Sequence, residues 1–356
     1  MPLLTNMDAF DVPPCGQVST TMFAASSAPV RDSRVEPILA GPAAGWMKRE
    51  QAIMGTAIVV ELWSDEAAAG EAAIGAVMAE MHRIDRTMSP HKEDSELSRI
   101  NRGAGAGPVP VSPEMARLIV RGAEFSALSG GALDITYAAV GQLYDYRKHI
   151  RPSDDELARA RTAVGWRHLV LDSQAGTVRF ARPGMRIDLG GFAKGHAVDN
   201  AVAILRRRGI AHAMVSAGGD SRVIGDRRGR PWTIGVRDPR RPGQVAAVLP
   251  LEDVSISTSG DYERYFDSEG TRFHHLIDPA TGKSPREIQS VTILADDGLI
   301  CEALSKIVFV LGVERGMALV ETQSGVDAVV VDAAGALHFS SGLLAPPPPS
   351  SASKTQ

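Results

Sequence analysis

Two kinds of apolar pattern are interspersed between residues 52 and 332. Residues 67–88 repeat apolar side chains at helical spacing, which predicts a long amphipathic helix. The run at 52–63 directly before it is rich in β-branched residues and predicts a strand. Further short strands and helices follow without the strict strand–helix alternation of a doubly wound parallel sheet. The pattern therefore predicts an α+β, or mixed α/β, fold.

The other elements are predicted from the same two periodicities and from helix caps. Ser112-Pro113-Glu114 is typical of a helix start, with a cap residue, a proline and then an acid. The polar segment that follows residue 88 is expected to be a loop. We expect helices at 113–129, 154–164, 194–208, 299–311 and 316–324, and strands at 169–172, 177–181, 186–188, 213–216, 232–236, 245–249, 255–258, 290–295 and 328–332.

Composition changes at both ends of the chain. Residues 1–48 are rich in Ser, Thr, Pro and Ala and predict a loose head, and residues 344–356 predict a disordered Pro/Ser tail. One folded domain is expected at 49–343. The net charge of −4 gives no reason to expect nucleic acid, and two cysteines make no disulfide framework. Without a charged secretory start or an apolar run of about 20 residues, we expect a cytoplasmic protein with no membrane span.

The segment Asp188-Leu189-Gly190-Gly191-Phe192-Ala193-Lys194-Gly195 carries the strongest local signal. An acidic residue ends a predicted strand, glycines follow, and a helix then begins. Free N–H groups at a helix start favour phosphate, and glycines allow the backbone to approach a ligand. Asp188 could accept hydrogen bonds from a sugar or a base, or support a metal. A tight turn without a ligand explains the pattern equally well.

Two other segments are less specific. Gly218-Gly219-Asp220 repeats the glycine theme after a predicted strand, although a plain turn is the favoured interpretation. His274 and His275 are adjacent, so their side chains point to opposite sides of a strand and do not readily share one metal. One of them could be a general base near neutral pH, but a single histidine is more often structural.

Glu302, Ser305 and Lys306 fall on one face of the predicted helix 299–311. A carboxylate and a hydroxyl on one face could meet Mg²⁺, which prefers oxygen ligands. An ordinary Glu–Lys pair four residues apart is the interpretation that the sequence alone favours.

Together these segments resemble the FAD:protein FMN transferase (ApbE) family. The resemblance covers residues 53–342 and implies a two-lobed fold that clasps FAD, with Mg²⁺ at the pyrophosphate. It further implies that a Thr or Ser hydroxyl of a target protein attacks the FMN-side phosphorus and that AMP leaves. The matching stretches are Met54-Gly55-Thr56, MSPHKEDSELSRIN, GALDIT, DLGGFAKGHAVD, Gly218-Gly219-Asp220, STSGDYERYF and HHLIDPATGKSP.

The resemblance also implies site residues. His275 matches a family histidine that would serve as the base for the attacking hydroxyl. The residues expected at the metal are the backbone of Gly191 and the side chains of Glu302, Ser305 and Lys306. The expected FAD contacts are Met54, His91, Ala132, Leu133, Asp134, Asp188, Lys194 and Arg286.

Departures from the family pattern leave alternatives open. Many members have Tyr at His91 and Asp at Glu302, and Lys306 replaces an expected metal-ligating Thr hydroxyl. Either Lys306 points away while Glu302 and Gly191 hold Mg²⁺, or its ammonium partly replaces the metal. Two other functions also stay open: an FAD-binding protein without catalysis, and a hydrolase that splits FAD into FMN and AMP.

Overall fold

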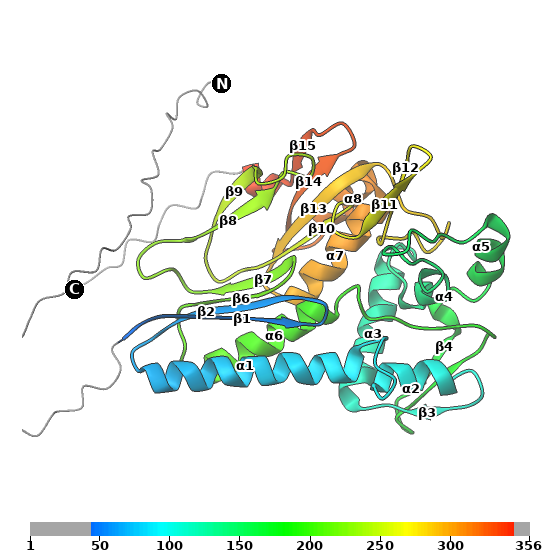
Figure 1. Cartoon of the computed structure of the whole chain (residues 1–356), viewed down its shortest axis with the longest axis horizontal. Coiled ribbons are helices and arrows are strands. Elements are labelled where there is room, and N and C mark those ends of the chain that lie inside the picture. Colours follow the sequence, from blue (N-terminus) through cyan, green and yellow to red (C-terminus); the bar gives the residue numbers. More distant parts are fainter. Residues whose placement is uncertain (1–43, 345–356) are drawn as a thin grey trace, which may run out of the picture. The chain divides into compact units, whose positions relative to one another are not determined.

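An antiparallel sheet of eight strands forms the centre of the fold in the computed structural model, which describes residues 44–344 (Figure 1). The strand order is β1-β2-β6-β7-β10-β13-β14-β15. Its members are β1 (Gly45–Ile53), β2 (Thr56–Ser64), β6 (Ala213–Ala217), β7 (Asp220–Ile224), β10 (Ser255–Gly260), β13 (Ile288–Ala295), β14 (Asp327–Asp332) and β15 (Leu337–Phe339). The expected α+β class is confirmed.

Four helices cover one face of this sheet. They are α1 (Ala67–Met88), α6 (Ala193–Arg207), α7 (Gly298–Leu311) and α8 (Val313–Glu321). Each packs against the next, and α7 also lies on β10 and β13 (Figure 1). Side chains of successive strand residues alternate between faces, so Val291 and Ile293 of β13 join the main core beneath the helices.

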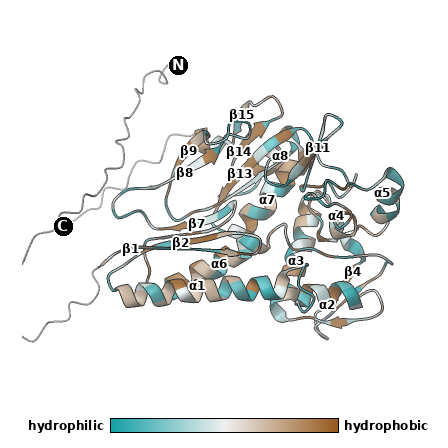
Figure 2. Cartoon of the chain, in the orientation of Figure 1, coloured by the Kyte–Doolittle hydropathy of each residue, from teal (hydrophilic) through white to brown (hydrophobic). Residues whose placement is uncertain are grey.

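The hairpin of β8 (Trp232–Arg237) and β9 (Val245–Leu251) supplies a second, smaller core. Trp232 and Leu251 of this hairpin pack with Val223, Ile256 and Leu294 of the large sheet. Because both faces of the central strands are covered, all eight residues of β13 are buried. Figure 2 shows the resulting hydrophobic colour of β13 and β14, in contrast to the hydrophilic colour of α5 (Asp154–Arg161).

The remaining elements form short helices and two smaller sheets. One sheet has the order β3-β5-β4, and the other pairs β11 with β12. Within residues 44–344 no helix is long and apolar enough to cross a membrane. The elements are α2 (Glu96–Gly103), β3 (Val109–Pro110), α3 (Pro113–Leu128), the 3₁₀ turns Ile135–Tyr137 and Trp166–His168, α4 (Ala138–Gly141), β4 (Leu169–Asp172), β5 (Thr177–Phe180), β11 (Tyr265–Ser268), β12 (Thr271–His274) and α9 (Ser341–Leu344).

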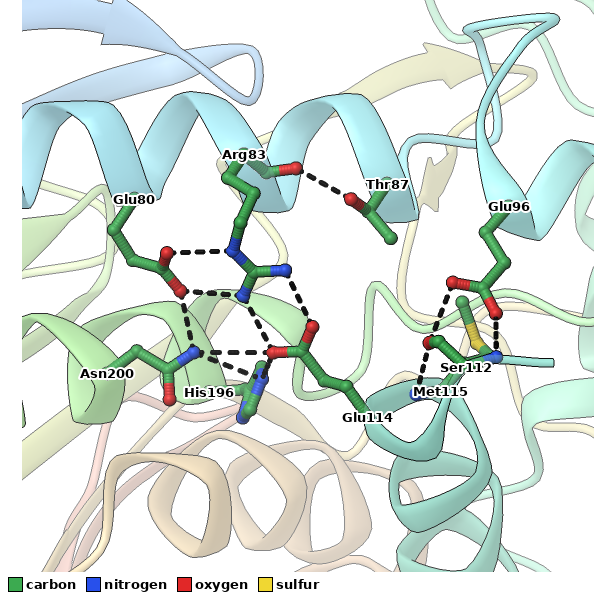
Figure 3. Close-up of polar contacts among 9 residues, drawn as sticks. All are labelled: Glu80, Arg83, Thr87, Glu96, Ser112, Glu114, Met115, His196 and Asn200. Carbon is green, nitrogen blue, oxygen red and sulfur yellow. Dashed lines mark hydrogen bonds and ion pairs between the residues drawn. The ribbon is translucent and has the colours of Figure 1, made fainter.

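A charged network joins α1, α3 and α6 (Figure 3). The Arg83 guanidinium donates to Glu114 at 2.7 and 2.8 Å and to Glu80 at 2.7 and 2.8 Å. A ring nitrogen of His196 lies 2.8 Å from Glu114, and Asn200 donates to Glu80 at 2.8 Å. Paired guanidinium–carboxylate bonds of this kind fix both distance and orientation. The network therefore ties the helices of the large sheet to α3.

Several predicted elements are wrong. Residues 52–63 do not form one strand, because the chain turns at Met54 and Gly55, whose φ angles are 55° and 71°. Strand β1 begins at Gly45, inside the segment expected as a loose head. Part of the expected polar loop is helix α2, which Ser95 caps. Residues 1–43 of the expected head, and the tail from residue 345, lie outside the described residues.

The expected strand at 186–188 is also absent from the described sheets. The backbone N–H of Ile187 donates to Asn101 at 2.8 Å, and the Ile187 carbonyl accepts from the same side chain at 2.9 Å. The N–H of Asp188 donates to the Ile135 carbonyl. A side-chain amide thus satisfies the backbone groups that a neighbouring strand would otherwise bond. The segment lies outside the strands and leads from Asp188 to the start of α6.

Candidate functional site

Helices α6 and α7 approach each other closely where both begin. Gly195 makes this possible, because a Cβ atom at that position would lie 2.2 Å from the Gly298 carbonyl oxygen. Asp199 of α6 accepts hydrogen bonds from the first N–H groups of α7, Gly298 at 2.8 Å and Leu299 at 2.9 Å. The two helix starts therefore form a fixed unit above β7 and β10.

A cluster of two lysines and two carboxylates fills the space between these helices and the sheet. Glu302 is fully buried, and its Oε1 accepts from the ammonium groups of Lys194 at 2.9 Å and Lys306 at 3.1 Å. Its Oε2 accepts from the backbone N–H of Gly195 at 2.7 Å. Lys194 also pairs with buried Asp220 at the start of β7. We call Lys194, Asp220, Glu302 and Lys306 the lysine–carboxylate cluster.

The cluster shifts the proton affinities of its members. Burial alone would raise the pKa of Glu302, but the two ammonium groups and the Gly195 N–H outweigh it and hold that pKa below its usual value. Burial would lower the pKa of Lys194, but the carboxylates of Asp220 and Glu302 raise it. For Lys306 the effect of burial prevails over its carboxylate neighbours, and the pKa is lowered.

The hydroxyl of Ser305 faces the sheet instead of the cluster. Its Oγ lies 2.8 Å from the Oγ of Ser259 and 3.3 Å from that of Ser257, both on β10. It also donates to the Glu302 carbonyl at 2.8 Å, while Ser257 donates to Asp220 at 2.6 Å. Ser305 therefore anchors α7 to β10 and supports Asp220 through Ser257.

These residues do not fit Mg²⁺. Both carboxylate oxygens of Glu302 already accept hydrogen bonds, and Ser305 faces β10. Two unit charges 4 Å apart interact by about 4 kcal/mol at intermediate dielectric, so each ammonium would repel a divalent ion by roughly twice that. Among residues 44–344 no three His, Cys, Asp or Glu residues are grouped to hold a metal. Glu302, Ser305 and Lys306 are thus not arranged as a ligand set, and the backbone of Gly191 as a metal ligand stays a prediction.

His275 directly follows β12, and the charged lysines of the cluster act on it electrostatically. Its backbone N–H donates to the Arg264 carbonyl at 3.1 Å. Its Nδ1 is buried and has no hydrogen-bond partner within the described chain. Burial lowers the pKa of His275 to about 3, and the positive charges of Arg264, His274, Lys306 and Lys194 add to this effect. His275 is therefore uncharged at neutral pH.

His274 has a different environment. Its ring is buried edge-on against Phe309, and one ring nitrogen lies 2.8 Å from the Pro285 carbonyl oxygen. Burial lowers its pKa, and the hydrogen bond with Pro285 partly offsets that shift. His274 is thus held by Pro285, although its Nδ1, like that of His275, is buried without a partner in the described residues.

Asp188 lies at the edge of the site among aromatic and basic groups. It accepts a hydrogen bond from Gly190 N–H at 2.5 Å. Burial raises its pKa, while that N–H and the positive charges of His91 and Arg264 oppose the rise. The negative charge of Asp188 is in turn the largest cause that raises the pKa of Tyr137, ahead of burial. His91, Arg264 and Tyr137 are thus within electrostatic range of Asp188.

The other expected FAD contacts have different positions. Met54 occupies the β1–β2 turn and packs against the main core. Ala132 and Leu133 follow α3, and Leu133 is buried. Both oxygens of Asp134 are already engaged, one by Thr136 and the other by the Trp166 N–H at 2.9 Å. His91 and Arg286 are exposed. The structure thus gives Asp134 a local supporting role, and these FAD contacts stay predictions.

Five residues of this region were not among the expected site residues. Asp220 completes the lysine–carboxylate cluster. Ser257 donates a hydrogen bond to Asp220, and the hydroxyl of Ser259 bonds that of Ser305. Tyr137 and Arg264 lie within electrostatic range of Asp188. The glycine pair before Asp220 and the segment STSGDYERYF contained a signal for four of them. Tyr137 carries no comparable local pattern.

Comparisons with known proteins indicate the family of this chain. The profile of the ApbE family matches residues 54–330. The chain is 33% identical over 315 residues to an FAD:protein FMN transferase of Treponema pallidum, covering 83% of this chain and 87% of that protein. A Vibrio cholerae protein of the same name is 34% identical over 248 residues, covering 68% and 74%.

Two solved structures are also similar. The ApbE protein of Thermotoga maritima superposes with a TM-score of 0.79 at 32% identity, covering 84% of this chain and 98% of that chain. The flavin transferase ApbE of Vibrio cholerae gives a TM-score of 0.76 at 28% identity, covering 85% and 99%. The chain belongs to the ApbE family.

Proposed function

We propose that this protein transfers FMN from FAD to a Thr or Ser hydroxyl of an acceptor protein and releases AMP. Relatives that match along most of both chains are named FAD:protein FMN transferases. The observation that carries the proposal for this chain is the placement of uncharged His275, with a buried Nδ1 that has no partner in residues 44–344, within electrostatic range of the ammonium groups of the cluster.

The reaction balances as a phosphoryl transfer. The acceptor oxygen forms a bond to the FMN-side phosphorus, and the bond from that phosphorus to the bridging oxygen of AMP breaks. The bridging oxygen keeps the bonding electrons and leaves with AMP. The hydroxyl proton passes to His275, which is unprotonated at neutral pH.

Positive groups near His275 suit the charge that this reaction handles. Lys194, Lys306 and Arg264 all act on His275 electrostatically. Cations that are fixed before the substrate arrives stabilise developing negative charge without reorganisation. Two negative phosphates bound here would also raise the pKa of His275 toward the range where it is an effective base.

The acceptor must present its hydroxyl to the same phosphorus. The substrate class of the proposed reaction is therefore a protein with an accessible Thr or Ser. The expected contacts of Met54, His91, Asp188 and Arg286 with FAD belong to this proposal.

The test combines purified protein, FAD and a candidate acceptor from the same organism. AMP release and the intact mass of the acceptor are measured together. We expect equal amounts of AMP and of an adduct with the mass of FMN less water. AMP without any adduct would indicate FAD hydrolysis, and bound FAD without either product would indicate a flavin binder; both results contradict the proposal.

A further inference from the structure

The hydrogen bonds of Glu302 leave its carboxylate no free oxygen for a metal. Its side chain has no exposed surface, one oxygen accepts from two ammonium groups, and the other accepts from Gly195. That Gly195 N–H belongs to the first turn of α6, so the carboxylate also caps this helix. A metal at Glu302 would have to displace hydrogen bonds that hold α6 and α7 together.

The charges of the cluster already balance. Lys194 and Lys306 carry one positive charge each, and Asp220 and Glu302 carry one negative charge each. A divalent cation binds where carboxylates leave uncompensated negative charge. The lysine–carboxylate cluster leaves none.

Lys306 nevertheless has unused donors. Among the described residues its ammonium donates only to Glu302, and 17% of its side chain remains exposed. Lys194, which is 27% exposed, donates to Asp220 and Glu302. Because an ammonium has three N–H groups, both lysines can donate further.

A multiply charged anion satisfies these spare groups together. The pyrophosphate of a dinucleotide offers several acceptor oxygens, and hydrogen bonds from an ammonium to phosphate are charge-assisted even where carboxylates balance its charge. We propose that Lys306, together with Lys194, takes the place of a divalent cation at this site, so that the pyrophosphate of FAD binds without metal. The identity of the anion rests on the proposed function, whereas the lack of a metal site rests on Glu302.

The first test uses the full-length protein and Mn²⁺ as a paramagnetic probe. We expect the electron paramagnetic resonance signal of free Mn²⁺ to be unchanged by the protein, with FAD alone as the reference for samples that contain FAD. The FAD affinity, measured by flavin fluorescence, should agree within about twofold in EDTA and in Mg²⁺. Stoichiometric loss of the Mn²⁺ signal, or at least about tenfold tighter FAD binding in Mg²⁺, would overturn the proposal.

The second test uses Lys306→Thr, with Lys48→Thr as the control because Lys48 is exposed on β1. In EDTA we expect Lys306→Thr to bind FAD at least about tenfold more weakly, and Mg²⁺ to restore part of that loss. Lys48→Thr should match the wild type. Unchanged FAD affinity of Lys306→Thr in EDTA would contradict the proposal. Should that variant fail to fold, Lys306→Met, which keeps the length of the stem, provides the same comparison.

The outcomes separate this inference from the proposed function. Metal-independent FAD binding without transfer to any acceptor supports the inference and contradicts the transferase. Transfer that proceeds only in Mg²⁺, together with Mn²⁺ binding, supports the transferase and overturns the inference.

Discussion

Glu302 connects several parts of the site through one buried side chain. It accepts hydrogen bonds from Lys194, Lys306 and Gly195, and so joins α6 to α7. A carboxylate without exposed surface is stable only when its charge is compensated in this way. Residues that we propose to act on FAD are therefore held by the same contacts that hold the two helices.

Replacing His275 should separate catalysis from binding. We expect His275→Gln to lower the rate of FMN transfer by roughly 10²- to 10⁴-fold, because the acceptor hydroxyl loses its base. FAD affinity should change little. His82→Gln is the matched control, since His82 is exposed on α1. Transfer rates of both variants that equal the wild-type rate would exclude His275 as the base.

The pKa of His275 should respond to Lys306. Lys306 is one of the positive charges that, after burial, lower this pKa to about 3. We expect Lys306→Thr to raise the His275 pKa, measured by NMR titration of the imidazole, whereas Lys48→Thr should leave it unchanged. A lower or identical pKa in Lys306→Thr would show that the two side chains do not interact.

The lowered pKa of His275 also determines how this residue makes stability depend on pH. Because the folded pKa of His275 lies below the usual value of 6.5, the unfolded chain takes up this proton first as the pH falls. The contribution of His275 to stability is thus complete above about pH 6.5 and is lost as the pH falls toward 3.

The sequence predicted the contacts of α7 side chains within the helix, but not their contacts with distant segments. The Glu302–Lys306 pair follows from helical spacing and is present. Its burial, and the third partner Lys194, depend on contacts between segments far apart in the chain. The direction of the Ser305 hydroxyl likewise depends on Ser259 of β10. No local pattern contains that information.

At the scale of elements, the approach of α6 to α7 depends on Gly195. We expect Gly195→Ala to destabilise the fold by about 1–3 kcal/mol or more, because its Cβ would meet the Gly298 backbone. Gly75→Ala in α1 is the matched control, since no atom lies within 4 Å of its Cβ position. That change should stabilise by about 0.5–1 kcal/mol. Urea unfolding of the two variants checks both signs, and equal effects would rule out the close approach.

The network in Figure 3 should make stability depend on pH. The hydrogen bond from Arg83 to Glu114 is the main reason that the pKa of Glu114 falls to about 2. Burial opposes this shift, and the hydrogen bond with His196 adds to it. The stability that Glu114 contributes is complete above its usual pKa of 4.5 and is lost as the pH falls toward 2.

Removing the charge of Glu114 should lower the free energy of unfolding more than removing the charge of Glu124. We expect Glu114→Gln to lower the free energy of unfolding by about 1.5–3 kcal/mol at neutral pH. Glu124→Gln, in the same helix and paired only on the surface with Arg121, should change it by less than about 0.5 kcal/mol. Thermal unfolding between pH 7 and 3 provides the comparison. Two identical pH profiles for Glu114→Gln and the wild type would show that the network does not titrate as described.

Most elements were predictable because their periodicity is local. The helix 67–88 matches α1, and the expected helices at 113–129 and 299–311 match α3 and α7 within one residue at each end. The β1–β2 hairpin was missed because Met54, a residue that seldom adopts a positive φ, occupies the turn before Gly55. Helix α2 was missed because its apolar side is short and polar residues surround it.

At the scale of the whole molecule, the antiparallel sheet places the site at one edge of a helix layer. Strands β7 and β10 bring Asp220 and Ser257 beneath the starts of α6 and α7. The sequence predicted the α+β class, but it did not predict the strand order, because pairing between distant strands depends on tertiary packing.

The central claim is that this chain attaches FMN to protein. The most direct measurement adds the purified protein and FAD to a lysate of the source organism from which its gene has been deleted, so that every natural acceptor is present and unmodified. We predict a flavin-fluorescent band that survives denaturing electrophoresis, whose peptide carries FMN on Thr or Ser, and that His275→Gln does not produce. If the FAD-binding wild-type protein yields no covalent flavin in that lysate, the account is contradicted.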